Sequence, residues 1–263
     1  MIGIKRASHV IAPVIALALG GAQANAAELI TNGGFETNSG NYQIGYTGHF
    51  LSGWTSANAS PGTLGYNFVF NAQSPTTSGT SADNSGSFGD SDSSAIKLWG
   101  PGTGNNNNLT VSPNGGAFVA LDGDYHVGAL SQTLSGLQIG QAYQLSFYWA
   151  ASQQSNRDGA TYQSLTVSFG SQSYDTSTVT LPSHGFSGWM LEHYTFVATS
   201  ATQTLSFLAH GSAVSGGPGS LPPFLLLDGV SMQAVPEPST FALMGLGLVG
   251  VVGARLRRSR RSE

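Results

Sequence analysis

Hydrophobic and polar residues alternate with a period of two through much of the chain, and this pattern predicts β-strands. In residues 143–149 every second residue is Tyr, Leu, Phe or Trp, and residues 205–209 repeat the pattern with Leu, Phe and Ala. Further strands are predicted at 28–32, 94–99, 116–121, 129–135, 162–169, 189–197 and 223–233. No helical period persists between residues 27 and 234, so the sequence favours an all-β, antiparallel sandwich.

Three segments between the predicted strands have the composition of loops. GLQIGQ at 136–141 and GPGTGNNNN at 100–108 carry glycines and asparagines, which favour turns. Residues 71–94 are rich in Ser, Thr, Asn and Gly and are expected to form a polar loop rather than a second core. Residues 27–234 are therefore predicted to be one domain.

The first 26 residues have the pattern of a secretory signal peptide. Lys5 and Arg6 precede an apolar stretch at 10–19, and Ala24-Asn25-Ala26 is a small-x-small cleavage site. Cleavage is expected after Ala26, so this segment is excluded from the fold.

The C-terminal tail, residues 235–263, has three parts in order. Pro236, Glu237 and Pro238 form a turn, and residues 241–254 are apolar and uncharged. A basic cluster follows, made of Arg255, Arg257, Arg258, Arg260 and Arg261. Fourteen helical residues span about 21 Å at ~1.5 Å each, short against a bilayer core of roughly 30 Å. The arginines would hold this end in the cytoplasm, and on physical grounds an ordinary tail anchor remains possible.

The order of these parts resembles the PEP-CTERM sorting signal over residues 235–261. That resemblance implies recognition and cleavage by an exosortase after export through the general secretion machinery. It further implies transient insertion of the tail in the inner membrane, and a mature protein at the cell surface or outside the cell.

The charge of the predicted domain limits the classes of molecule that it is expected to bind. Residues 27–234 contain two Lys or Arg and eleven Asp or Glu, which leaves a net charge of −9. Nucleic acid and anionic membrane surfaces are therefore excluded as expected partners. The chain has no cysteine, so the fold has no disulfide to stabilise it.

Several motifs of this domain resemble the galactose-binding-like jelly roll found in many carbohydrate-binding modules. They are LITNGGFE at 29–36 with GWT at 53–55, GAFVALDGD at 116–124, residues 129–151, and FLLLDGVSM at 224–232. The resemblance implies a jelly-roll β-sandwich, and in related modules a structural calcium lies between the first and last strands.

Two acidic residues require a counter-charge. In the alternating run 224–232, Asp228 is expected on one apolar face with Phe224, Leu226, Val230 and Met232. Glu36 follows Phe35 directly. Because a buried carboxylate must be neutralised, paired or metal-bound, and basic residues are scarce, Glu36 and Asp228 are predicted to bind Ca²⁺. Asp122 is a possible further ligand. The alternative is that the acids cap loops through backbone N–H groups.

Asp122, Asp124 and His126 in LDGDYH could form a metal or acid/base cluster, but a turn alone explains Asp-Gly-Asp. The chain lacks the sequence motifs of serine hydrolases, zinc proteases and P-loop enzymes. A carboxylate pair for glycoside hydrolysis stays open, because its separation depends on the fold. The protein is predicted not to be an enzyme.

Aromatic residues provide the remaining signal, because sugar rings stack on exposed aromatic faces. Trp149, Trp54 and Trp189 are expected to pack in the core. Tyr148, Tyr125 and Trp99 are the predicted ligand-binding residues. The sequence thus predicts an exported, non-catalytic protein that binds or organises extracellular polysaccharide. A structural matrix protein without a specific ligand, and less favourably a glycan-active enzyme, are the alternatives.

Overall fold

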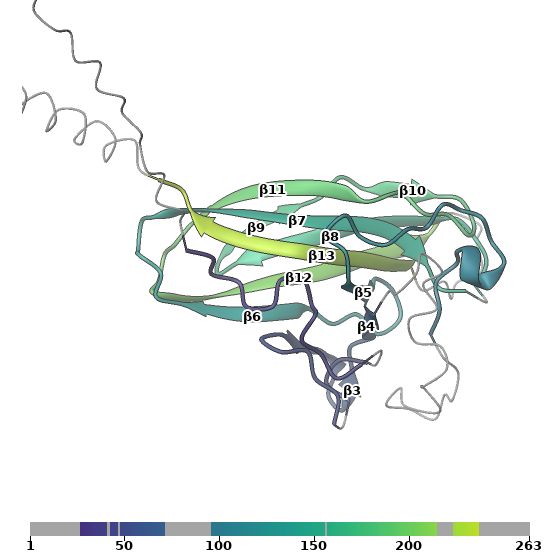
Figure 1. The fold of residues 1–263 in the computed structure, drawn as a ribbon, viewed down its shortest axis with the longest axis horizontal. Coiled ribbons are helices and arrows are strands. Elements are labelled where there is room, and N and C mark those ends of the chain that lie inside the picture. Colours follow the sequence, from purple (N-terminus) through teal and green to yellow (C-terminus); the bar gives the residue numbers. More distant parts are fainter. Residues whose placement is uncertain are drawn as a thin grey trace, which may run out of the picture.

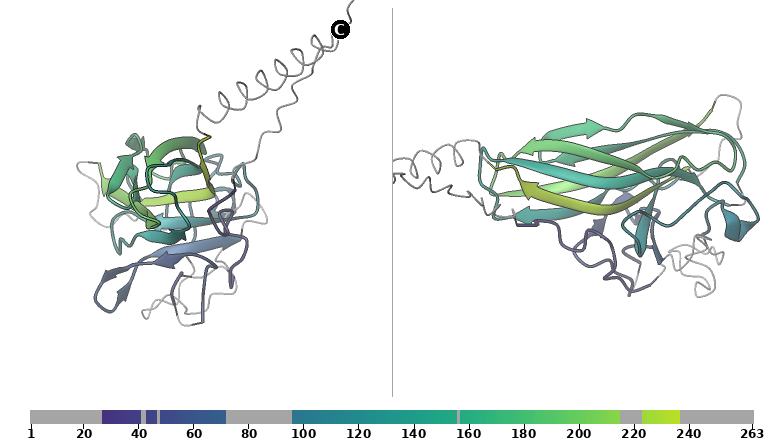
Figure 2. Two further views of the ribbon diagram at one scale, coloured as in Figure 1. Left: turned by 90° about the vertical axis from the view of Figure 1, so that its left-hand side faces the viewer. Right: turned by 45° about the horizontal axis from the view of Figure 1, so that its top comes forward.

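The two-layer arrangement follows from the alternation seen in the sequence. The computed structural model describes residues 27–40, 43–46, 48–71, 96–155, 157–214 and 223–236. Within these residues two antiparallel sheets pack face to face, and a short hairpin, β2–β3, forms a separate two-stranded sheet (Figures 1 and 2). The predicted all-β, antiparallel jelly-roll sandwich is confirmed.

The described strands vary in length from two to twelve residues. They are β1 (Thr55–Ser56), β2 (Asn58–Ser60), β3 (Thr63–Leu64), β4 (Asn67–Asn71), β5 (Ala117–Asp122), β6 (Leu130–Ser135), β7 (Ala142–Gln153), β8 (Thr161–Phe169), β9 (Gln172–Asp175), β10 (Val179–Leu181), β11 (Met190–Val197), β12 (Thr202–Ala213) and β13 (Pro223–Ala234). One 3₁₀ turn, η1 (Pro101–Thr103), lies in the long connection between β4 and β5.

One sheet has the order β11-β7-β13-β5-β4, and the other has the order β1-β6-β12-β8-β10 with β9 beside β8. From β5 onward, the chain crosses between the sheets at β5 to β6, β6 to β7, β7 to β8, β10 to β11, β11 to β12 and β12 to β13. Because each sheet receives strands that are far apart in sequence, the loops at the two ends of the sandwich bring distant segments together.

The main core lies between the sheets, as the period-two pattern predicts. Every second residue of β7 from Tyr143 to Trp149 belongs to it, as do Leu205 and Phe207 of β12. Phe207 packs against Phe147 with ring centroids 5.3 Å apart and against Trp54 at 6.0 Å. The expected core positions of Trp149 and Trp54 are therefore confirmed.

A second apolar cluster covers the outer face of the β11-β7-β13-β5-β4 sheet. It contains residues of the sheet such as Phe118 and Phe224, and residues of the β4–β5 connection such as Leu98 and Leu109. Trp189 packs at its border, with its indole N–H donated to the Thr110 carbonyl at 3.1 Å. Strand β5 is buried along its whole length because both of its faces are covered.

Some strand predictions were wrong at the margins of the sheets. Residues 28–32 form only one isolated bridge, from Glu28 to Gln233, and the described part of 94–99 forms only the bridge from Leu98 to Gln154. Both segments lie beside the ends of long strands, where one or two backbone bonds hold them. The predicted strands at 116–121, 129–135, 162–169, 189–197 and 223–233 are confirmed within one residue at each end.

The predicted face of Asp228 was partly wrong. Phe224 and Leu226 belong to the outer cluster, whereas Val230 and Met232 belong to the core between the sheets. The pairing of β13 with β7 shifts register between Asp228 and Ser231, and this bulge reverses the faces. Asp228 therefore follows the outer-face residues and is not in line with Val230 and Met232.

The signal peptide, most of the polar segment 71–94, and the tail beyond Pro236 lie outside the described residues. In the part of the chain that the structure describes, no helix has the length and apolarity needed to cross a membrane.

Candidate ligand-binding site

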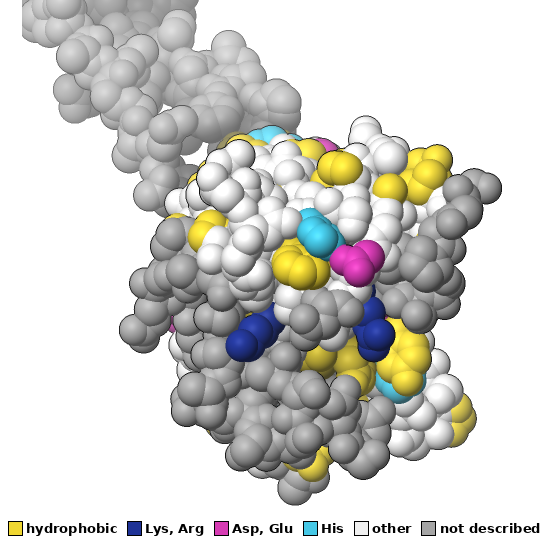
Figure 3. All heavy atoms as spheres, turned by 90° about the vertical axis from the view of Figure 1, so that its right-hand side faces the viewer, with side chains coloured by type: hydrophobic (Ala, Val, Ile, Leu, Met, Phe, Trp, Pro, Cys, Tyr) yellow, Lys and Arg dark blue, Asp and Glu magenta, His cyan; other side chains and the backbone are white. Residues whose placement is uncertain are grey.

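The loops at one end of the sandwich come together because β5, β7 and β12 end there and β8 and β13 begin there. Strands β5 and β7 end at this level and β13 begins there, as the pairs Phe224–Asp122 and Pro223–Gln153 show. Figure 3 views this end directly: hydrophobic, histidine, acidic and basic side chains gather on it. We call this surface the loop end.

Trp99 is fixed at the loop end by backbone hydrogen bonds on both sides. Its amide donates to the Gln153 carbonyl at 2.9 Å, and Ser155 donates to the Lys97 carbonyl at 2.8 Å. The indole N–H of Trp99 donates to the Arg157 carbonyl at 2.8 Å. Because three bonds connect this short segment to the end of β7, the half-buried indole has a defined orientation.

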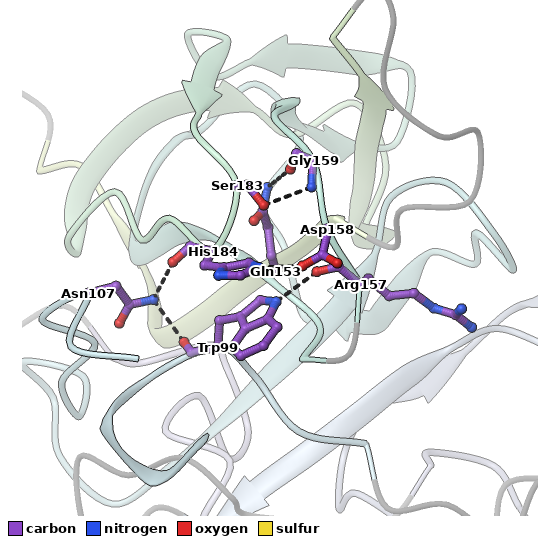
Figure 4. Close-up of polar contacts among 8 residues, drawn as sticks. All are labelled: Trp99, Asn107, Gln153, Arg157, Asp158, Gly159, Ser183 and His184. Atoms are coloured by element: carbon purple, nitrogen blue, oxygen red, sulfur yellow. Dashed lines mark hydrogen bonds and ion pairs between the residues drawn. The ribbon is translucent and has the colours of Figure 1, made fainter. Parts of the chain in front are cut away.

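His184 stacks on the indole of Trp99. The ring centroids are 3.9 Å apart and the planes meet at 27° (Figure 4). The His184 backbone has a φ of 62°, a left-handed conformation that costs about 1–2 kcal/mol for a residue with a side chain. Its imidazole Nε2 lies 2.5 Å from Oδ1 of Asp158, whose side chain is 77% exposed. The surrounding contacts thus hold His184 in an unfavourable backbone conformation.

Asn107 connects two of these loops. Its side-chain amide donates to the carbonyls of Trp99 and His184, both at 2.9 Å (Figure 4). Ser183 Oγ accepts the Gly159 amide at 2.8 Å, and Gly159 in turn accepts from the Gln153 side chain at 3.0 Å. Side chains from three separate connections therefore hold the Trp99–His184 pair in place.

A second aromatic pair lies on the turn after β5. Tyr125, 64% exposed, stacks on His126 with centroids 4.0 Å apart, and Tyr66 meets both rings edge-on. Because β5 and β7 end at the same level beside β13, this pair also belongs to the loop end.

Asp122 shapes the turn that carries Tyr125. Its Oδ1 accepts the amides of Asp124 and Tyr125 at 2.9 and 3.1 Å, and its Oδ2 accepts the amide of His126 at 2.8 Å. Burial raises the pKa of Asp122, and these three hydrogen bonds oppose that rise. The turn interpretation explains this acid. Asp122 lies at the end of β5, whereas Ala117, whose amide donates to Glu36, lies at its beginning. The two residues are about 17 Å apart at ~3.4 Å per residue, so Asp122 lies far from Glu36.

The three predicted aromatic residues do not form one platform. Trp99 and Tyr125 both lie at the loop end, but Tyr148 pairs with Asp228 on the outer face of the sheet. Tyr148 is five residues from the end of β7, about 17 Å away at ~3.4 Å per residue. His184, Asp158 and Asn107 were missed by the sequence analysis. The Asn-rich loop at 100–108 was predicted, but only the fold shows that it meets the segment that carries His184.

Glu36 and Asp228 do lie near each other, beside the segment 112–117. Asp228 is fully buried: its Oδ1 accepts the Gly229 amide at 2.6 Å and the Asn114 side chain at 3.3 Å, while Oδ2 accepts no hydrogen bond. Burial raises the pKa of Asp228 to about 7. The Gly229 amide, the Asn114 side chain and the nearby Ser112 hydroxyl lower this pKa, and the charge of Glu36 raises it.

Glu36 reaches the same segment from the N-terminal loop. Its Oε1 accepts the Ala117 amide at 2.7 Å, and a Cβ at Gly116 would lie 1.8 Å from that oxygen. Gly116 has a φ of 70°, so both its backbone and the nearby carboxylate require glycine. The orphaned Oδ2 of Asp228 and the Glu36 carboxylate suit a hard cation with oxygen ligands. No cluster of three or more His, Asp or Glu that could hold a metal occurs in the described segments, so amide, hydroxyl or backbone oxygens would complete such a site.

An all-β sandwich with a C-terminal sorting signal is the class of protein that these features define. The chain belongs to the family described as "Protein of unknown function (DUF642)", whose model matches residues 91–222. The PEP-CTERM protein-sorting motif matches residues 234–258, which confirms the resemblance seen in the tail. This motif indicates an exported protein whose membrane-anchored tail is handled by an exosortase.

Solved structures offer distant likenesses. One is the CBM61 module TmCBM61 in complex with β-1,4-galactotriose, at 16% identity over 80% of this chain and 100% of that one, with a TM-score of 0.38. Another is the CBM22-1 xylan-binding domain from Paenibacillus barcinonensis Xyn10C, at 9% identity over 81% and 97%, with a TM-score of 0.32. A third is the K1 adhesin domain of Lys-gingipain from Porphyromonas gingivalis W83, at 12% identity over 77% and 96%, with a TM-score of 0.38. A comparison with curated proteins finds no match.

Proposed function

We propose that this exported protein binds extracellular polysaccharide at the cell surface or in the surrounding matrix, without catalysing a reaction. The observation that carries the proposal is the Trp99–His184 stack at the loop end. A sugar ring has an apolar face that stacks on aromatic rings and hydroxyls that bond to polar groups at the rim. The loop end combines both kinds of group on one surface.

The way in which Trp99 is held supports binding. Its hydrogen bonds to Gln153 and Arg157 fix the indole before any ligand arrives. Such preorganisation lowers the entropic cost of binding. The exposed ring of Tyr125 adds a second stacking surface at the same end.

The polar groups at the loop end favour binding over catalysis. The imidazole of His184 is engaged by the Asp158 carboxylate, and its ring face is covered by Trp99. Ser183, its neighbour in sequence, uses its hydroxyl oxygen to accept the Gly159 amide. This arrangement orients a surface; it does not activate a nucleophile through the imidazole.

We further propose that Glu36 and Asp228 hold a structural Ca²⁺. The support is the buried Oδ2 of Asp228, which accepts no hydrogen bond, together with a second carboxylate whose charge acts on it. The two basic residues of the domain form no ion pair with Asp228 among the described residues. A cation here would connect the N-terminal loop, the segment 112–117 and β13.

Affinity electrophoresis of the purified full chain in gels containing single polysaccharides tests the binding proposal. Trp99→Ala should raise the dissociation constant obtained from the retardation at least about tenfold, which corresponds to ~1.4 kcal/mol of binding free energy. The matched control is Phe50→Ala, which removes an aromatic ring that is 57% exposed outside the loop end. Equal retardation of both variants and the wild type would contradict the proposed site. Release of reducing sugar by the wild type would contradict the non-catalytic assignment.

A further inference from the structure

The basic residues of the domain are concentrated where Trp99 lies. Of nine Lys and Arg in the chain, only Lys97 and Arg157 fall between residues 27 and 234, against eleven Asp and Glu. Lys97 accepts the Ser155 amide through its carbonyl, and Arg157 accepts the Trp99 indole N–H through its carbonyl. Both cations of a domain with a net charge of −9 therefore flank the same aromatic residue.

Neither of these cations forms an ion pair within the part of the chain that the structure describes. The single ion pair among the described residues is His184 with Asp158. Asp158 follows Arg157 directly in sequence, yet its carboxylate contacts the imidazole, and Figure 4 shows the Arg157 side chain extending away from it. In a domain with so many carboxylates, an exposed guanidinium without an acidic partner among the described residues is available to a ligand.

We propose that the saccharide bound at the loop end carries carboxylates, as a uronic-acid-type glycan does. This inference rests on the proposed glycan-binding function and names its ligand class. A guanidinium binds a carboxylate through two parallel hydrogen bonds, while the indole of Trp99 provides the stacking surface for the ring. Charges more than about 8 Å away are largely screened at physiological salt. Asp158, the acid next to Arg157 in sequence, lies against the His184 imidazole.

The test compares trigalacturonate with its methyl ester, which keeps the sugar rings and removes the charges. Binding to the purified full chain is measured by isothermal titration calorimetry at 50 and 500 mM NaCl. We expect the acid to bind at least about tenfold more tightly than the ester at low salt, with the difference shrinking at high salt. Arg157→Gln should remove most of that difference by weakening acid binding far more than ester binding, because the substitution keeps the backbone carbonyl that accepts the Trp99 indole N–H. Lys97→Gln should reduce the difference by a smaller factor.

A charge-restoring variant separates local from global effects. Arg157→Gln combined with Glu192→Lys adds back positive charge on β11, where Glu192 pairs with Phe147. That position is six residues from the end of β7, about 20 Å away at ~3.4 Å per residue. The double variant should bind the acid no better than Arg157→Gln alone. Recovery of acid binding would mean that net charge, and not the loop end, attracts the ligand.

The outcomes distinguish this inference from the proposed function. If Trp99→Ala weakens binding of ester or neutral saccharides while Arg157→Gln and Lys97→Gln change nothing, glycan binding stands and the acidic ligand class is overturned. If the acid binds equally well to the wild type and Trp99→Ala, the assignment to this site is overturned. If no saccharide binds the wild type, both the function and its ligand class fail.

Discussion

The calcium proposal predicts that the stability of the folded domain depends on pH in different ways with and without the cation. Without calcium, Asp228 must be buried either protonated or as an uncompensated charge. Its pKa of about 7 in the folded chain compares with the ordinary value of 3.8 for an aspartate. Between these values the folded state binds more protons than the unfolded state, so stability falls as pH rises from about 4 to about 7. A difference of about three pKa units corresponds to roughly 4 kcal/mol.

Calcium should reverse this loss. An ion that binds only the folded state stabilises it by RT ln(1 + [Ca²⁺]/Kd), about 2.7 kcal/mol at a hundredfold excess over Kd. It also favours the ionised carboxylate, so the decline in stability between pH 4 and pH 7 should be smaller with calcium. Chelation at pH 8 should lower the Tm by several degrees, since ~1 kcal/mol corresponds to about 2–4 °C in a domain of this size.

Asp228→Asn provides the decisive comparison by differential scanning calorimetry at pH 8. In calcium the substitution should lower the Tm, because a ligand is lost. In chelator it should raise the Tm above that of the chelated wild type, because the uncompensated charge is gone. Glu36→Gln should likewise weaken the response to calcium. A wild-type Tm that is indifferent to calcium and chelator, with Asp228→Asn more stable in both, would refute the cation and leave Asp228 as a buried acid without a counter-charge.

Three other predictions concern processing, the core and the independence of the two sites. Intact-mass measurement of the exported product should show loss of residues 1–26 and of the Arg255–Arg261 cluster. Replacing Pro236, Glu237 and Pro238 with alanine should leave the tail membrane-inserted and uncut. Unchanged release of this variant would place exosortase recognition elsewhere in the chain. Phe207→Ala should destabilise the domain by about 3–5 kcal/mol in chemical denaturation, because its ring lies between two other aromatic rings, and a cost below about 1 kcal/mol would contradict this packing. Chelation of calcium should change the saccharide affinity measured by calorimetry less than about threefold. The reason is that Trp99 is held by hydrogen bonds to Gln153 and Arg157, and not by the segment 112–117 beside Glu36 and Asp228.

The strands that sequence analysis could predict are those with one face in the core between the sheets. β7, β12 and the other long strands alternate because their inner residues pack against the opposite sheet. The outer cluster was missed, although the unbroken apolar run AFVAL in β5 is typical of a strand buried on both faces. Strands such as β9 and β10 were also missed, because short edge strands have few residues over which a period can be detected.

The candidate sites were predicted unequally for physical reasons. Glu36 and Asp228 could be paired from sequence because a carboxylate among apolar residues requires compensation wherever the fold places it. The bulge after Asp228 could not be predicted, since Gly229 is compatible with a regular strand as well as with a turn. Trp99 was predicted to be an exposed, ligand-binding ring, and the structure has it half-buried. Its partners His184 and Asp158 come from loops whose meeting depends on the order of strands in both sheets.

The connection between β4 and β5 relates the two candidate sites to the fold. Its residues Leu98 and Leu109 cover the outer face of the sheet, and the same segment presents Trp99 at the loop end. Farther along, Asn114 donates to Asp228 near the opposite end of β5. The apolar residues of this connection therefore have two effects: they bury the outer face, and they position polar and aromatic residues at both ends. A loop anchored by a hydrophobic cluster can carry functional side chains with the precision of a strand, because packing and a few hydrogen bonds to neighbouring segments together fix its path.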